Sequence, residues 1–111
     1  MGMTRNELYA SEHIALAMKL KAIAHPARLM MVAHMMKQED CINAGFVELT
    51  GLKQPTVTRH LGELVAAGLV SRSCGGGYCI NPEGWRELEA GLGPIWSEAG
   101  EMKPNCNTGK C

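Results

Sequence analysis

The segment from Leu52 to Val70, LKQPTVTRHLGELVAAGLV, constrains the fold of this chain more than any other part of it. Apolar residues recur there at i, i+4, i+7 and i+8, which predicts a helix over residues 55–67 with one buried face. These residues are Val57, Leu61, Leu64 and Val65. Pro55 suits the first helical turn, where no amide donor is needed, and Gly68 ends the helix.

The polar side chains near the start of this predicted helix are expected to face away from the apolar stripe. They are Gln54, Thr56, Thr58, Arg59 and His60. Such side chains, on the first turns of a helix that follows a short helix and turn, can reach base edges and phosphates in the major groove of DNA. We therefore predict a DNA-binding surface that also includes Lys53 and Arg72. By composition alone, an ordinary solvent-facing helix accounts equally well for the pattern.

Two short β-prone runs follow this helix, at residues 70–73 and 78–81, on either side of three glycines. The runs predict an antiparallel hairpin over residues 69–81, because Gly75, Gly76 and Gly77 permit the reversal. Helix, turn, helix and hairpin is the order of a winged helix-turn-helix domain. The predicted fold class is therefore mainly α with a small β-hairpin.

The rest of the chain predicts two flanking helices and the elements between them. The expected elements are helices at 6–24, from Pro26, at 46–49 and from Pro82, and a short strand at 41–43. The buried stripe of the second helix is expected to be Leu29, Val32, Ala33 and Met36. Gly91, Gly93 and Pro94 are expected to weaken or kink the last helix.

At 111 residues the chain predicts one domain with a modest core. We expect a DNA-binding and dimerisation domain at 1–100 and a flexible, cysteine-containing tail at 101–111. The terminal helices carry apolar stripes larger than so small a core needs, which favours a homodimer formed through them. Such a dimer would match a palindromic DNA site. The alternative is that both stripes complete the core of a monomer.

Charge is distributed unevenly along the chain. The net charge is zero, with 11 basic and 11 acidic residues, whereas nucleic-acid-binding domains often have a pI above about 9. Residues 53–72 nevertheless hold three Lys or Arg and one Glu, so the predicted DNA-binding surface is locally positive. No apolar run reaches the roughly 20 residues of a membrane span, and no signal peptide opens the chain. We therefore expect a cytoplasmic protein without a membrane partner.

Three segments together resemble the ArsR/SmtB family of winged-helix repressors over roughly residues 16–96. They are AIAHPARLMMVAHM, QPTVTRHLGELVAAGLV and the hairpin. The resemblance implies a homodimeric repressor that binds double-stranded operator DNA and leaves it when an inducer binds. No phosphate-binding glycine loop, nucleophile elbow or pair of catalytic carboxylates is evident, so an enzyme is not expected.

Five cysteines, Cys41, Cys74, Cys79, Cys106 and Cys111, are the candidate inducer ligands. In a winged helix the strand before the helix-turn-helix pairs with the second strand of the wing, which makes Cys41 and Cys79 cross-strand neighbours. Cys74 is expected at the other base of the hairpin, and Cys106 and Cys111 on the tail. Taken singly, each is better explained as a small buried hydrophobe or an idle thiol, and stable structural disulfides are not expected in the cytosol.

Three thiolates would suit trivalent arsenic or antimony, so we expect As(III) or Sb(III) as inducer and no obligatory cofactor. Family members that sense arsenite, cadmium or lead often carry Cys-X-Cys before the helix-turn-helix, where this chain has Cys41-Ile42-Asn43. YCIN followed by proline resembles a subgroup linked to arsenical resistance, in which a second cysteine often stands at the place of Gly77. A zinc site on the last helix is excluded, because no histidine follows His60. The alternative is a redox-sensing repressor with a reversible Cys41–Cys79 or Cys106–Cys111 disulfide.

Overall fold

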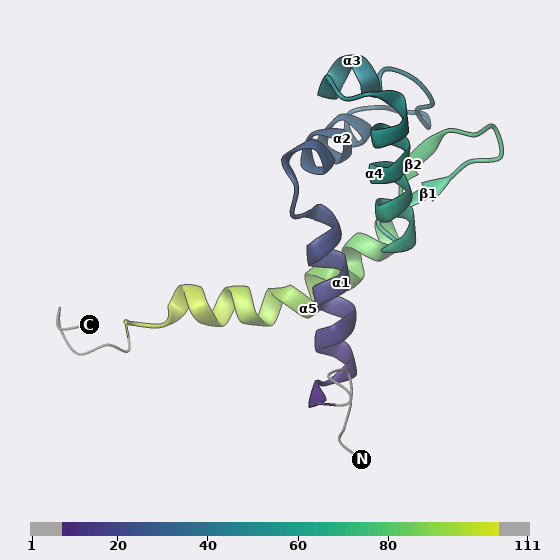
Figure 1. The fold of residues 1–111 in the computed structure, drawn as a ribbon. Helices are drawn as coiled ribbons and strands as arrows, with labels where there is room; N and C mark the ends of the chain where they lie inside the picture. The colour runs from purple at the N-terminus through teal and green to yellow at the C-terminus, as the bar shows by residue number, and fades with distance from the viewer. Residues whose placement is uncertain (1–7, 105–111) are drawn as a thin grey trace.

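The computed structural model describes residues 8–104, which form five α-helices and one two-stranded hairpin. In chain order these are α1 (Ser11–Ile23), α2 (Pro26–Met36), α3 (Phe46–Thr50), α4 (Gln54–Ala66), β1 (Val70–Arg72), β2 (Tyr78–Ile80) and α5 (Pro82–Glu101) (Figure 1). The predicted class, mainly α with a small β-hairpin, is confirmed. The order of elements is consistent with a winged helix-turn-helix.

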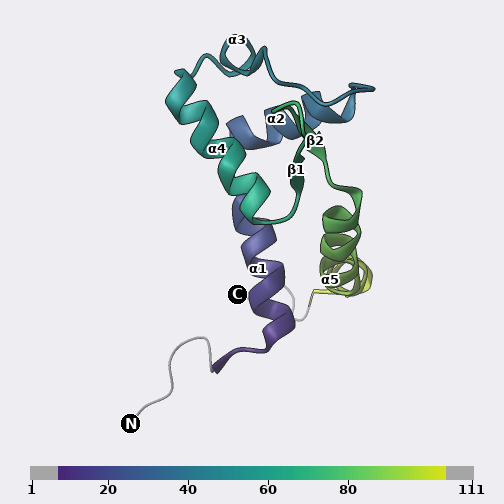
Figure 2. The same ribbon diagram turned by 90° about the vertical axis from the view of Figure 1, so that its right-hand side faces the viewer.

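Several predicted boundaries differ from the structure by one or more residues. The first helix begins at Ser11, since residues 8–10 are not α-helical. The strand predicted at 41–43 is reduced to a single antiparallel bridge between Ile42 and Tyr78. The last helix begins at Pro82 as predicted and continues through Pro94 to Glu101 as one element, whose second half runs in a different direction from its first half (Figures 1 and 2).

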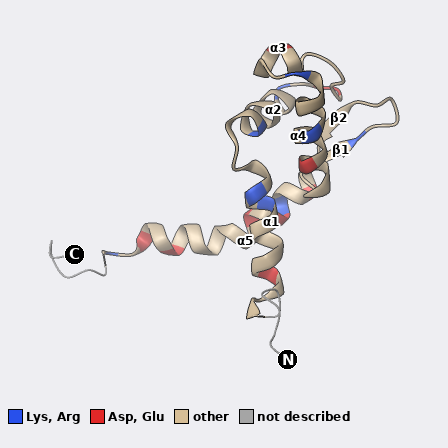
Figure 3. Ribbon diagram, viewed as in Figure 1, with Lys and Arg blue, Asp and Glu red and all other residues tan. Residues whose placement is uncertain are grey.

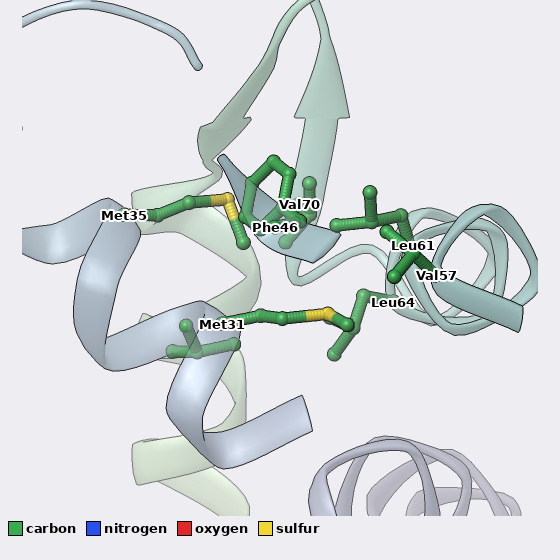
Figure 4. Close-up of a cluster of buried hydrophobic side chains, with 8 residues drawn as sticks. Met31, Met35, Phe46, Val57, Leu61, Leu64 and Val70 are labelled. Carbon is green, nitrogen blue, oxygen red and sulfur yellow. The ribbon is translucent and has the colours of Figure 1, made fainter. Parts of the chain in front are cut away.

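The main core lies between α2, α3, α4 and β1 (Figure 4). Its largest fully buried side chains include Met31, Leu61 and Leu64, each at most 2% exposed. The predicted stripe of α2 is confirmed at Val32 and wrong at Leu29, Ala33 and Met36, which are exposed. The other buried residues of this helix are Met31 and Met35. Apolar residues surround α2 almost completely, so periodicity alone does not choose which face turns inward.

A second, smaller cluster joins α1 to α5. It contains Leu16, Ala22, Leu69 and Leu88, with Leu20 and Leu92 packed against it. An ion pair of 3.3 Å between Lys19 Nζ and Glu87 Oε2 also links the two helices. Part of each terminal stripe therefore completes the core of the monomer.

The start of α5 is held against the turn between α4 and β1 by hydrogen bonds. The Asn81 side-chain amide donates to the carbonyl of Gly68 (2.8 Å), and the Trp85 indole donates to the carbonyl of Leu69 (3.0 Å). The backbone amide of Asn81 also donates to the Leu69 carbonyl (3.1 Å). Gly84 is buried beside these groups, where the backbones approach closely.

The second half of α5 extends away from the rest of the domain (Figures 1 and 2). Its Trp96 is 74% exposed and Ile95 is 51% exposed. The predicted tail at 101–111 begins at the last residue of α5, and residues 105–111 lie outside the described part of the chain. Within residues 8–104, no helix has both the length and the apolar character that crossing a membrane requires.

Candidate nucleic-acid interface and thiol pair

A tight turn after α3 places the start of α4. Gly51 ends α3 with a φ of 73°, a conformation in which glycine meets no steric penalty. The Thr50 hydroxyl donates to the Phe46 carbonyl (2.7 Å) and accepts from the Leu52 amide (3.2 Å), so the polar groups of the turn are paired. Val57, Leu61 and Leu64 then hold the inner face of α4 in the core.

The outer face of α4 carries most of the predicted DNA-binding side chains. Lys53, Gln54, Thr58 and Arg59 are exposed, and Thr56 is half-buried. The Gln54 side-chain amide donates to the Thr58 hydroxyl one turn further on (3.1 Å). Figure 3 shows basic positions on α4 and β1 and acidic positions on the distal part of α5, although α4 carries an acidic position as well. Direct DNA contact by these residues remains a prediction.

His60 does not face outward, contrary to the prediction. It is 6% exposed, and its Nδ1 accepts a hydrogen bond of 2.9 Å from Nε of Arg28 on α2. The reason is helical phase: His60 follows Val57 by three residues and precedes Leu64 by four, which places it on the inner side. His60 therefore has no exposed imidazole to offer to DNA in this conformation.

Burial and charge both act on the protonation of His60. Burial lowers the pKa of the imidazole below its ordinary value, and the positive charges of Arg28, His25 and Arg59 lower it further, against an opposing effect of Glu63. The neutral form is the one that offers Nδ1 as an acceptor to Arg28. This hydrogen bond is consequently expected to persist at neutral pH.

The hairpin forms in the predicted place, with Val70 paired to Ile80 and Arg72 paired to Tyr78. Arg72 is exposed at the end of β1, and its guanidinium carbon lies 5.3 Å from the centre of the Tyr78 ring. A cation over an aromatic face at this distance is stabilised by the ring quadrupole. Arg72 is thus positioned on the wing with its charge near solvent.

The predicted contact between the two strand cysteines is confirmed. Cys41 and Cys79 form a disulfide with their Cα atoms 4.6 Å apart, although a structural disulfide was not expected from the sequence. The adjacent Ile42–Tyr78 bridge, with N–O distances of 3.0 and 2.7 Å, places the two chain segments side by side. The pair therefore links the segment leading into α3 with the second strand of the wing.

Cys74 is not part of this pair in the structure. Cys74 is exposed and lies in the turn of the hairpin after β1 rather than at its base, so the predicted position was wrong. Cys106 and Cys111 lie outside the described residues. Among residues 8–104, no three His, Cys, Asp or Glu side chains gather in a geometry that could hold a metal ion.

Residues that support the interface from behind were missed by the sequence reasoning. Arg28 of α2 contacts α4 through His60, and Tyr78 lies beneath Arg72. Asn81 and Trp85 fix α5 to the end of α4. The contact of Arg28 joins residues 32 positions apart, and no periodicity within either helix indicates it.

A family model described as bacterial regulatory protein, arsR family, matches residues 25–72. No curated protein and no solved structure matches the chain. The matched segment extends from the residue before α2 to the end of β1 and so includes the whole helix-turn-helix. Residues 25–72, less than half of the chain, are therefore similar to the helix-turn-helix domain of bacterial arsR-family regulatory proteins.

Proposed function

We propose that the protein is a homodimeric repressor that releases a palindromic operator when trivalent arsenic or antimony binds the thiolates of Cys41 and Cys79. The observation that carries this proposal is the position of the cysteine pair. It joins the segment that enters the helix-turn-helix to the wing, so a ligand bound there acts on both predicted DNA-binding elements.

The exposed apolar residues of the terminal helices support the dimer. Tyr9 and Met18 are each 59% exposed at one end of the chain, and Trp96 is 74% exposed at the other. Tyr9, Ile14, Ala17 and Met18 line one mostly apolar groove along α1. Contiguous apolar surface of this kind favours association. A two-fold dimer would place two α4 helices on half-sites about one helical turn apart, roughly 10 base pairs.

The chemistry of the pair suits a thiophilic metalloid. With both cysteines reduced, arsenous acid, As(OH)₃, would form two As–S bonds and release two molecules of water, each from one hydroxide and one thiol proton. Soft thiolate ligands prefer such ions. A third thiolate would replace the last hydroxide, and Cys106 and Cys111 of the tail are the candidates for it. Cys74 is left out of the proposed set because, among residues 8–104, it does not join the pair in a group of three side chains that could hold a metal ion.

Release from the operator sets a lower limit on how strongly the inducer must prefer the released form of the repressor over the DNA-bound form. Moving a repressor from almost fully bound to almost fully released requires the inducer to prefer the released form about 10⁴-fold, or about 5.5 kcal/mol. Two As–S bonds that tie the entry segment to the wing in a changed geometry offer a source for this difference. One loose contact would not supply it.

A thiol-based redox repressor is the second candidate, and the Cys41–Cys79 disulfide is the observation that favours it. Hydrogen peroxide would oxidise the two thiols to this disulfide, with its oxygen atoms leaving as two molecules of water. Under this alternative, the oxidised and reduced proteins differ in operator affinity without any metalloid.

The test is release from a DNA duplex that the wild-type protein selects from a random-sequence pool. Arsenite is added in the presence of a phosphine reductant, which keeps the thiols reduced without offering competing sulfur. We expect release of the wild type, and we expect Cys41→Ser and Cys79→Ser to bind the duplex but not to respond. Cys74→Ser is the matched control and should respond as the wild type does.

Two further results decide between the candidates. Release by peroxide alone, with no response to arsenite under reductant, would replace the metalloid with a redox signal. Normal arsenite release by both Cys41→Ser and Cys79→Ser would show that the pair is not the sensor. A double Cys106→Ser and Cys111→Ser variant tests the third thiolate, because its loss should weaken arsenite binding without affecting operator binding.

A further inference from the structure

One arginine connects three helices behind the predicted DNA-binding surface. Nε of Arg28 donates to Nδ1 of His60 on α4 at 2.9 Å, and Nη1 of the same side chain donates to the carbonyl of Ala22, near the end of α1, at 3.1 Å. Since Arg28 itself belongs to α2, its guanidinium bridges α1, α2 and α4.

His60 is enclosed on the side where this bridge forms. It is 6% exposed, and the ring of His25 lies 4.5 Å from its own, centre to centre. The Nδ1 of His25 is occupied, because it accepts from the Ala27 amide (3.0 Å) and caps α2. The two histidines and Arg28 therefore form a fixed cluster at the junction of α2 with α4.

We propose that Arg28 is a positioning residue for operator recognition and that it acts through the neutral imidazole of His60 to fix the orientation of α4. The inference rests on the proposed reading of a specific operator by α4. It goes beyond that function because it gives Arg28 and the buried His60 a role that needs no contact with DNA.

The contact depends on one protonation state. An arginine Nε always carries its hydrogen, so Nδ1 of His60 can accept only while it is unprotonated. The charged groups that act on His60 are Arg28 and His25 on the side of α2 and Arg59 and Glu63 on α4. Lys21, His25, Arg28 and Glu63 line one cavity of about 470 Å³. Protonation of His60 would remove the hydrogen bond and place a cation against a mostly positive surrounding.

This arrangement gives operator binding an unusual pH dependence. Lowering the pH adds positive charge to a protein, and non-specific binding to phosphates then tightens. Loss of the Arg28–His60 contact would instead loosen α4 and weaken selective binding. The two effects have opposite signs and can be separated by comparing a selected duplex with an unrelated duplex of equal length.

The experiment measures affinities for both duplexes between pH 7.5 and 5.0 at constant ionic strength. The wild-type protein should lose about ten-fold in affinity for the selected duplex, the scale of one hydrogen bond to a buried group. Its affinity for the unrelated duplex should hold or rise. His60→Asn offers an acceptor that does not titrate, so its selective binding should stay near the wild-type level at pH 7.5 and should not fall with pH.

Arg28→Met removes the donor and should bind the selected duplex about ten-fold more weakly at pH 7.5, with a flattened pH profile. Lys37→Met is the matched control, because Lys37 is an exposed basic residue at the end of the same helix. It should keep the wild-type profile. If Arg28→Met does not fold, as judged by circular dichroism, the pH profile of His60→Asn decides.

Three outcomes overturn or separate the claims. A wild-type affinity for the selected duplex that rises toward pH 5.0 overturns the inference, as does a His60→Asn variant that keeps the wild-type fall. Wild-type binding and pH profile in a folded Arg28→Met variant overturn it as well. Failure of the wild-type protein to select any duplex would instead overturn the proposed operator reading on which the inference rests.

Discussion

Replacing Gly84 by alanine should destabilise the fold through a backbone collision. Gly84 lies in the first turns of α5, and a Cβ built there would overlap the carbonyl oxygen of Gly68 and lie 2.8 Å from its carbonyl carbon. Both atoms belong to the turn between α4 and β1, and backbone cannot move aside as the end of a flexible side chain can. The start of α5 must therefore shift outward.

The size of the effect follows from what that shift breaks. Three hydrogen bonds hold this part of α5: two from Asn81 and one from the Trp85 indole, at 2.8–3.1 Å. Each contributes about 1 kcal/mol net, whereas alanine gains about 1 kcal/mol over glycine in a helix interior. The net destabilisation is about 2 kcal/mol, and separation of Leu88 from its cluster would add to it.

Urea unfolding followed by circular dichroism measures this difference. Gly62→Ala is the matched control, because Gly62 is helical, exposed and has no atom within 4 Å of an added Cβ. That variant should be more stable than the wild type by up to about 1 kcal/mol. A Gly84→Ala variant with a midpoint equal to or above that of the wild type would refute the reasoning, because it would show that the close approach of α5 to Gly68 does not exist in solution.

Three further predictions concern DNA binding, assembly and acid stability. If Arg59 contacts a base, Arg59→Ala should weaken operator binding by about 1–3 kcal/mol and relax the sequence specificity. Lys53→Ala should weaken binding to all duplexes alike and reduce the salt slope of binding by about 1. Equal effects of Arg59→Ala on selected and unrelated DNA would contradict the assignment of Arg59 as a base contact. Trp96→Glu should give a folded monomer in sedimentation, because Trp96 is 74% exposed and contributes little to the monomer core; an unchanged dimer would place the interface elsewhere. Burial lowers the pKa of His60 in the folded state, so the unfolded chain takes up a proton at this residue first as the pH falls. The neutral His60 therefore contributes to the free energy of unfolding above about pH 6.5, and this contribution declines below that pH. Urea midpoints should accordingly fall less with pH in His60→Asn than in the wild type.

The local pattern of the sequence determined which segments became helix, turn and hairpin. The 3.6-residue spacing of Val57, Leu61 and Leu64 fixes the inner face of α4, and three glycines between two β-prone runs fix the wing. The winged order of elements in turn predicts Cys41 beside Cys79, where the structure has them. These features follow from short-range geometry, which a sequence expresses directly.

Only the tertiary structure decided which face of a uniformly apolar helix turns inward and which polar residue becomes buried. Met31 and Met35 of α2 lie in the core while Leu29 and Met36 remain exposed, and hydrophobicity does not separate these residues. His60 reads as one more polar residue of a recognition helix until Arg28, 32 residues earlier, provides a partner for it inside the protein. A buried polar group is tolerated where a hydrogen bond meets it, and that partner is supplied by packing between helices rather than by the sequence around either residue.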